Sequence, residues 1–224
     1  VMSLDLLGEG FDLHCGGADL RFPHHENERA QAVALGKQFA NHWMHNGFVV
    51  DAEGEKMSKS LGNVANLLDL LDHYDPRAYR MLLLQSHYRS PVRVGQDNID
   101  ASVKALAGLD SFAARSAQFS GGSVDHAIKA RFVAAMDNDL DTTQAMAIIF
   151  DTVRAANVAV DAGDASTVAT LRATVIEIAG ALGLELAAGD DISDDVAAKA
   201  AALDAARAAK DFATADAIRN ELQD

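Results

Sequence analysis

The sequence predicts an α/β fold followed by an all-α fold, for two reasons. In the first third of the chain, short strand-like runs alternate with a helical pattern and glycine turns, as in a nucleotide-binding sheet. From residue 96 onward, apolar residues recur at helical spacing in long segments joined by short loops, which is typical of an antiparallel helical bundle. With 224 residues, 49% of them hydrophobic, the chain can bury one or two cores.

The first elements are expected to be a strand, a helix and a hairpin. Residues 11–14 read as a short strand closed by a glycine pair. Pro23 suits the first turn of a helix over residues 24–36. The dipeptide Asn46-Gly47 between apolar flanks indicates a hairpin.

The strand signal nearly vanishes in the next segment. A strand over residues 48–50 leads into a turn at 51–54. Asn66 is expected to cap a helix over residues 67–71, and Asp75-Pro76 to open another, as cap and first helical residue.

The bundle is expected to bury apolar residues that share helical spacing. They are Ile99, Val103, Leu106, Leu109, Phe112, Ile128, Phe132, Met146, Ile149, Val153, Val160, Leu171, Val175, Ile178 and Leu182. Gly183 is expected to end the last of these helices. Residues 187–195 are acidic and contain glycine, which predicts a linker before a final alanine-rich helical pair.

Composition restricts the classes of function. No apolar run is long enough to cross a bilayer and no signal peptide is recognisable, so a cytoplasmic location without a membrane partner is expected. The single cysteine, Cys15, excludes an internal disulfide, fits a reducing compartment and is expected to be a buried or half-buried bystander.

The net charge of −14 is unfavourable for nucleic-acid binding as a whole. Residues 1–95 carry 9 Lys/Arg against 12 Asp/Glu, whereas residues 96–224 carry 10 against 21. The first part is therefore close to neutral, and a local basic patch there could still bind RNA.

Lys56 and Lys59 stand in the loop Lys-Met-Ser-Lys-Ser, the most informative stretch of the chain. Lysine is a compact cationic phosphate ligand, and two of them on a loop of small residues suit a triphosphate whose charge shifts during a reaction. A solvated charged turn is the alternative interpretation.

Two further sets of residues could bind ligands. His24 and Glu28 lie four apart on the expected helix, so both side chains lie on one face and offer zinc ligands, although an ordinary surface pair would have the same spacing. Asp19 follows a glycine turn after a strand, where a carboxylate can accept hydrogen bonds from ribose hydroxyls. A simple turn is the alternative for Asp19.

In combination, these motifs resemble the cysteinyl-tRNA synthetases, a family of class I aminoacyl-tRNA synthetases. The segments that carry the resemblance are residues 11–20 (FDLHCGGADL), 22–28 (FPHHENE), 43–47 (WMHNG), 56–60 (KMSKS) and 87–90 (HYRS), and more weakly 136–140 (MDNDL) and 208–212 (AAKDF). The resemblance covers nearly the whole chain.

The resemblance implies four parts. Residues 1–63 would be the C-terminal part of a Rossmann-like class I catalytic domain, and residues 64–95 a stem-contact segment. Residues 96–186 would form the antiparallel helical bundle on the anticodon side, and residues 187–224 a linker with a C-terminal helical pair.

It also implies an activity: ATP-dependent activation of cysteine to an adenylate, then transfer to the 3′ end of tRNA. Lys56 and Lys59 would contact the ATP phosphates, and Asp19 the ATP ribose or the terminal adenosine of tRNA. His24 and Glu28 would hold zinc, with the remaining ligands outside this chain. Zinc binds a thiolate far better than a hydroxyl, so the metal would select cysteine over serine.

Four arginines fall where the family has its stem-contact element. They are Arg77, Arg80, Arg89 and Arg93. The resemblance implies contacts with the phosphates of the tRNA acceptor arm, and exposed arginines on an acidic protein are the alternative. DNA is not expected as a partner.

The family's histidine motif of the HIGH type and its two zinc-binding cysteines are not found in this sequence. The chain is therefore expected to be an internal fragment that is inactive alone. Two alternatives remain. One is the related ligase that joins cysteine to an amino-sugar inositol in thiol biosynthesis, and the other is a non-catalytic module that binds tRNA or a protein partner.

Overall fold

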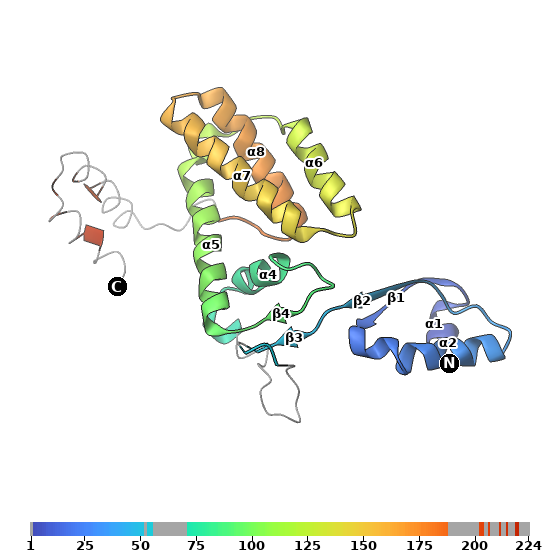
Figure 1. Ribbon diagram of the computed structural model, residues 1–224. Helices are drawn as coiled ribbons and strands as arrows, with labels where there is room; N and C mark the ends of the chain where they lie inside the picture. Colours follow the sequence, from blue (N-terminus) through green and yellow to red (C-terminus); the bar gives the residue numbers. More distant parts are fainter. Residues whose placement is uncertain are drawn as a thin grey trace.

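The computed structural model describes residues 2–51, 53–55 and 71–187, and seven single positions between 202 and 219. Figure 1 shows an α/β part that carries the N-terminus, a helical part, and the short strands β3 and β4 between them. The predicted order, α/β and then all-α, is confirmed.

A two-stranded parallel sheet organises the N-terminal part. Its elements are α1 (Met2–Leu7), β1 (Phe11–Gly17), the 3-10 helix η1 (Ala18–Arg21), α2 (His24–Ala34) and β2 (Ala40–Asn46). Phe11 lies opposite Ala40, and Gly17 lies opposite Asn46. Parallel strands require a crossover, which η1 and α2 supply here.

Strand β1 is longer than predicted, because its glycines belong to the strand instead of ending it. A Cβ atom on Gly16 would lie 2.7 Å from the imidazole ring of His25. Glycine at this position therefore lets helix α2 place a ring directly against the strand.

The predicted hairpin at Asn46-Gly47 is wrong. Strand β3 (Val49–Val50) belongs to a second sheet, where it pairs in parallel with β4 (Val92–Arg93), a strand that the sequence did not reveal. The Gly47 amide donates to the carbonyl oxygen of Tyr88 at 2.7 Å, and a Cβ atom there would lie 2.3 Å from the carbonyl oxygen of Ser90. Glycine is thus needed for a close approach of two backbones.

Two of the predicted local structures are confirmed. Gly54 has a φ of 90° and its amide donates to the carbonyl oxygen of Asp51, closing the expected turn. Asp75 caps α4 (Pro76–Leu84) by accepting from the amide of Arg77 at 2.8 Å. The expected helix at residues 67–71 and its Asn66 cap lie outside the described residues, apart from residue 71.

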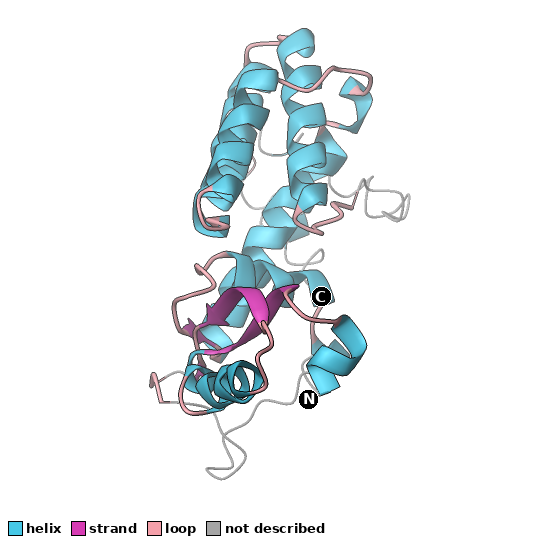
Figure 2. Cartoon of the chain, turned by 90° about the vertical axis from the view of Figure 1, so that its right-hand side faces the viewer, coloured by secondary structure: helices cyan, strands magenta, loops and turns pink. Residues whose placement is uncertain are grey.

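Four long helices form the second part, as predicted. They are α5 (Gln96–Arg115), α6 (His126–Asp137), α7 (Thr142–Asp161) and α8 (Ala165–Ala181). Figure 2 shows them gathered at one end of the molecule, with the strands toward the other end. Most predicted core residues are buried, but Val103 and Val160 are 37% and 41% exposed, so these two assignments are wrong.

Helix α4 joins the bundle to the strands. Its residues Ala78 and Met81 belong to the main core, while Leu82 packs with Val94 and Ile99 in a second cluster. After α8, Gly183 takes a φ of 71° and Leu184 is fully buried, so the helix ends where the sequence predicts. The expected linker and terminal helical pair lie almost wholly outside the described residues.

Candidate functional site

Three histidines meet where α2 crosses the β1–β2 sheet. Strand β1 contributes His14, β2 contributes His45, and α2 places His25 between them with only 4% of its surface exposed. Nδ1 of His25 lies 2.8 Å from Nε2 of His45, and Nε2 of His14 lies 2.8 Å from Oε2 of Glu28. Two hydrogen-bonded pairs therefore lie side by side on one helix face.

The environment favours the neutral form of His25. Burial lowers the pKa of His25 most, and the neighbouring His14 and His45 lower it further. A neutral imidazole can act as a hydrogen-bond acceptor or a metal ligand, which an imidazolium cannot.

Nitrogen atoms of three histidines lie around the carboxylate of Glu28. The ligand atoms of His14, His25 and Glu28 lie within 4.8 Å of one another, and Nε2 of His24 lies 3.7 Å from Oε2 of Glu28. Two ligands of a tetrahedral zinc ion are about 3.3–3.5 Å apart, given bonds of about 2.0–2.1 Å. The His24–Glu28 spacing is close to this value, whereas the 2.8 Å contact of His14 is a direct hydrogen bond that orients the carboxylate.

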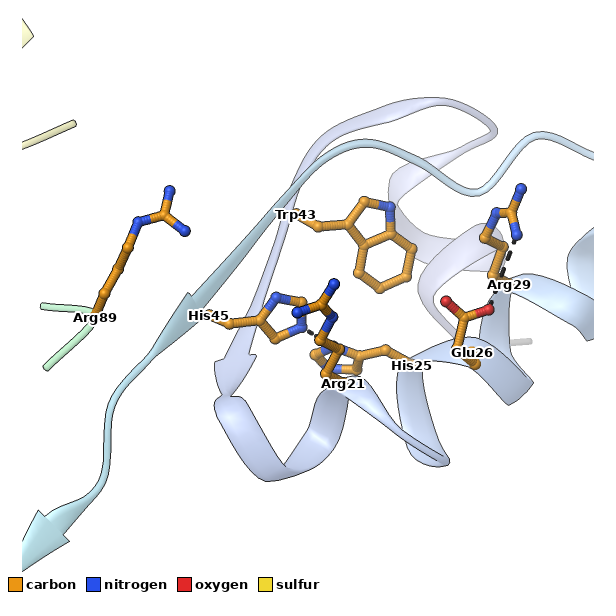
Figure 3. A pocket seen from close by; sticks show the side chains of 7 residues that line it. All are labelled: Arg21, His25, Glu26, Arg29, Trp43, His45 and Arg89. Carbon is orange, nitrogen blue, oxygen red and sulfur yellow. Dashed lines mark hydrogen bonds and ion pairs between the residues drawn. The ribbon is translucent and has the colours of Figure 1, made fainter. Parts of the chain in front are cut away.

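A cavity of about 440 Å³ opens beside the histidines. Its lining residues are Arg21, His25, Glu26, Arg29, Trp43, His45 and Arg89. Figure 3 shows Trp43, His25 and His45 gathered around one side, with Arg89 set apart at the other. Three guanidinium groups and one indole ring suit a ligand that carries both an anionic group and a flat or apolar group.

Aromatic contacts hold the indole ring in place. The ring of Trp43 stacks on Phe39 at a centroid distance of 5.6 Å and meets His14 edge-on at 5.0 Å. Because β1 and β2 are in register, His14 lies opposite Trp43 across the sheet. The pairing of the strands therefore fixes the positions of both His14, a possible metal ligand, and Trp43, which forms part of the cavity wall.

The structure places the predicted ligand residues unequally. His24 and Glu28 are brought together. Asp19 lies on η1, and its carboxylate is folded back toward the preceding residues: a Cβ atom added to Gly17 would lie 2.6 Å from Oδ1 of Asp19. Lys56 and Lys59 lie outside the described residues. Cys15 is exposed, so the expectation of a buried or half-buried thiol is wrong: side chains alternate along β1, and His14 is the one that faces α2.

The predicted arginines differ in how far they are engaged within the chain. Arg77 donates to Asp75, to Asp110 and to the carbonyl oxygen of Glu185, and the hydrogen bond with Asp75 is the main cause that raises its pKa. Arg89 is paired with Asp139.

Arg80 and Arg93 are exposed. The guanidinium of Arg80 lies beside Gly183, where a Cβ atom would approach it at 2.9 Å. Arg93 lines a second cavity, of about 330 Å³, between α4 and the start of α5.

Sequence reasoning missed the residues that only pairing brings together. His14, His45 and Trp43 are up to 31 positions apart, yet neighbour one another across the parallel strands. A usable signal existed, because seven of the eight histidines precede residue 95.

Comparison with known proteins gives two family matches. Residues 1–104 match the family model described as the tRNA synthetases class I (C) catalytic domain, and residues 131–187 match the DALR domain. No described helix is long and apolar enough to cross a membrane.

Curated relatives match the chain over its whole length. The cysteine–tRNA ligases of Cutibacterium acnes and Halorhodospira halophila are 42% and 43% identical to it, over 99% and 100% of the chain. The matched regions are 49% and 50% of those proteins, so the chain spans about half the length of the curated relatives it matches.

Solved structures share the fold. The LeuRS–tRNA–LeuAMS ternary complex of Agrobacterium radiobacter K84 aligns with a TM-score of 0.63 at 17% identity, over 78% of this chain and 26% of that one. Mycobacterium tuberculosis methionyl-tRNA synthetase bound by methionyl-adenylate aligns with a TM-score of 0.58 at 20% identity, over 80% and 42%.

Proposed function

Because this chain belongs to the class I aminoacyl-tRNA synthetases and is a homologue of the cysteine–tRNA ligases, we propose that it forms part of a cysteine–tRNA ligase. The ligase would use ATP to activate cysteine as an adenylate and then transfer cysteine to the 3′ end of tRNA in the cytoplasm. The observation that carries this proposal is an identity of 42–43% over 99–100% of the chain.

His24 and Glu28 are proposed as zinc ligands, with further ligands from outside this chain. The two donors suit zinc chemically, and their 3.7 Å spacing is close to that of two ligands on one ion. Zinc bound there would ligate a thiol as thiolate and so favour cysteine over serine. His14 would orient Glu28 through its 2.8 Å hydrogen bond.

The ATP contacts are proposed from the sequence. Lys59, assisted by Lys56, would stabilise the charge that develops on the phosphoryl oxygens and the departing pyrophosphate. A lysine that binds mainly in this state raises the rate, whereas one that binds equally throughout only tightens ATP binding. Asp19 would accept from a ribose of ATP or of the terminal adenosine.

The four-part organisation also remains a proposal: residues 1–63, 64–95, 96–186 and 187–224. The tRNA contacts fall on the arginines of the second part. Arg80 and Arg93, which are exposed and form no ion pair with another described residue, are the better candidates for phosphate contacts. Arg77 and Arg89 could contact tRNA only while keeping or exchanging their carboxylate partners.

The test is to express the complete reading frame that encodes these 224 residues and to assay the purified protein for cysteine-dependent pyrophosphate exchange and for cysteinylation of tRNA. A mock purification from host cells that lack the gene controls for contaminating host enzyme. Both activities are expected in the wild type. Transfer of cysteine to an amino-sugar inositol but not to tRNA would overturn the proposal in favour of the related ligase. Binding of tRNA without either reaction would indicate a non-catalytic module.

A further inference from the structure

The turn between α6 and α7 has an unusual backbone. Asp139 and Leu140 have φ values of 57° and 55°, and neither is glycine. Side chains disfavour this left-handed region, although aspartate tolerates it better than most residues, and leucine does not. Two such residues in succession persist only where surrounding contacts hold them.

The carboxylate of Asp139 makes contacts of this kind, in addition to the backbone hydrogen bonds of the turn. Oδ2 accepts from Nε of Arg89 at 2.6 Å, and Oδ1 accepts from Nη2 of Arg89 at 3.0 Å and from the Tyr88 hydroxyl at 2.6 Å. Nε2 of His87 lies 3.8 Å from Oδ2. Three consecutive residues, about fifty positions earlier in the chain, thus converge on one carboxylate of the bundle.

The segment that contains these three residues is held against the end of the strand that carries the cavity wall. The carbonyl oxygen of Tyr88 accepts from the amide of Gly47, the residue directly after β2, and the backbone of Ser90 lies against Gly47. Strand β2 carries Trp43 and His45, and Arg89 itself lines the cavity with them. A continuous path of contacts therefore runs from Asp139 to the candidate site.

We infer that Asp139 is a positioning residue for the candidate site: through Arg89 and Tyr88, it lets the α6–α7 turn of the bundle hold residues 87–90 against the end of β2 and so set the edge of the cavity. The inference deepens the proposed function, since that cavity would be part of the ligase site. The contacts themselves do not depend on which reaction occurs there.

The arrangement also predicts how the ion pair of Arg89 and Asp139 responds to an anion. Arg89 is 61% exposed and is one of the residues that line the cavity. Its partner is a carboxylate that an arriving phosphate could replace, because guanidinium groups bind both in the same two-point geometry. Anion binding at Arg89 and release of Asp139 would then be coupled.

The test uses the 224-residue chain and its single tryptophan, Trp43. Acrylamide quenching of Trp43 fluorescence measures the accessibility of the cavity wall without requiring any activity. Asp139→Asn removes the charge while retaining a residue that tolerates the left-handed backbone. Glu177→Gln is the matched control, because it removes another exposed carboxylate of the bundle, which pairs with Lys129.

Asp139→Asn and Arg89→Ala are each expected to raise the quenching constant about twofold, and the double variant no further, since both remove one interaction. Glu177→Gln should leave it unchanged, and Arg89→Lys should restore part of the protection. The inference is overturned if both single variants have the quenching constant of the wild type, or if their effects add in the double variant. The contact would then serve only the stability of the fold. Circular dichroism confirms folding, and Asp139→Gly, which accepts the backbone without strain, replaces the Asn variant if that one unfolds.

A second measurement separates this inference from the proposed function. In the complete protein, Asp139→Asn is expected to alter kcat or KM for tRNA in cysteinylation by at least about threefold, with Glu177→Gln unaffected. If no cysteinylation occurs in the wild type, the proposed function fails while the fluorescence result still decides the role of Asp139. Unchanged kinetics in an active enzyme would overturn the inference alone.

Discussion

The guanidinium group of Arg77 binds the carboxylate of Asp110 through two parallel hydrogen bonds, Nη1 to Oδ1 at 3.0 Å and Nη2 to Oδ2 at 2.9 Å. Arg77 also donates to the carbonyl oxygen of Glu185, and Asp110 accepts from the amide of Ala187. One ion pair therefore ties α4, α5 and the segment after α8 together. Both side chains are largely shielded, with 27% and 21% exposed.

Replacing Arg77 by alanine is expected to lower the free energy of unfolding by about 2 kcal/mol, because charge-assisted hydrogen bonds are lost and the largely shielded carboxylate of Asp110 is left without its partner. Arg154→Ala removes an exposed ion pair with Asp151 on α7 and should change the free energy of unfolding by less than about 0.5 kcal/mol. Urea denaturation of the 224-residue chain measures both. Equal, small effects would show that the Arg77 pair is energetically a surface pair.

The sequence predicts the bundle well because the apolar spacing within each helix marks the face that the helix buries. Leu109, Ile149 and Val175 recur at helical spacing and are all nearly fully buried. Val103 and Val160 keep the spacing but are exposed, since periodicity does not tell how far a partner helix extends.

The sheets were harder to predict, because pairing joins segments that are distant in sequence. Asn46-Gly47 has the composition of a hairpin turn, yet its glycine serves a close backbone contact with Ser90. Strand β4 is only two residues long and carries no periodic signal. Local pattern cannot distinguish these cases, because the deciding contact is 43 residues away.

In the candidate site, too, contacts within one helix could be predicted and contacts between distant segments could not. His24 and Glu28 could be paired from their spacing on one helix, and the structure places them 3.7 Å apart. His14 could not be assigned, since it reaches Glu28 only through the packing of α2 on β1. Arg77 and Arg89 looked like free cations, because their partners Asp110 and Asp139 lie on other elements.

Replacing Glu28 by glutamine is expected to weaken zinc binding of the complete protein by about 10- to 100-fold, since an amide is a poorer zinc ligand than a carboxylate. Glu26→Gln is the control on the same helix, because Glu26 is exposed and lies near Arg29 at 3.9 Å. Competition with a chromogenic chelator measures the affinity. Equal affinities of the two variants would remove Glu28 from the proposed site.

In the complete protein, Lys59→Ala is expected to slow cysteine-dependent pyrophosphate exchange by about a hundredfold or more, the usual cost of removing one partner of developing charge. Lys56→Ala should be less damaging. The loss should appear in kcat, since the proposed contact forms mainly during the reaction. Lys37→Ala, which removes a lysine paired with Glu9, is the control and should match the wild type. Exchange by Lys59→Ala within a few-fold of wild type would contradict the assignment.

The ion pair of Asp139 also predicts a specific dependence of stability on pH. The hydrogen bond from Arg89, and then that from Tyr88, lower the pKa of Asp139 from 3.8 to about 2. Between these values the unfolded chain binds more protons at this position than the folded chain does, so stability falls as the pH falls. The contribution of the carboxylate is therefore fully present above about pH 4 and lost as the pH drops through about 2.

Thermal unfolding of the wild type and of Asp139→Asn from about pH 5 to about pH 2 tests this dependence. All other carboxyl groups titrate in both proteins, so their effect cancels in the difference between the two Tm values. The wild type is expected to have the higher Tm at pH 5, and the difference should shrink toward zero at pH 2. A difference that is constant across this range would mean that the charge of Asp139 does not stabilise the folded state, and that its effect on the α6–α7 turn comes from shape alone.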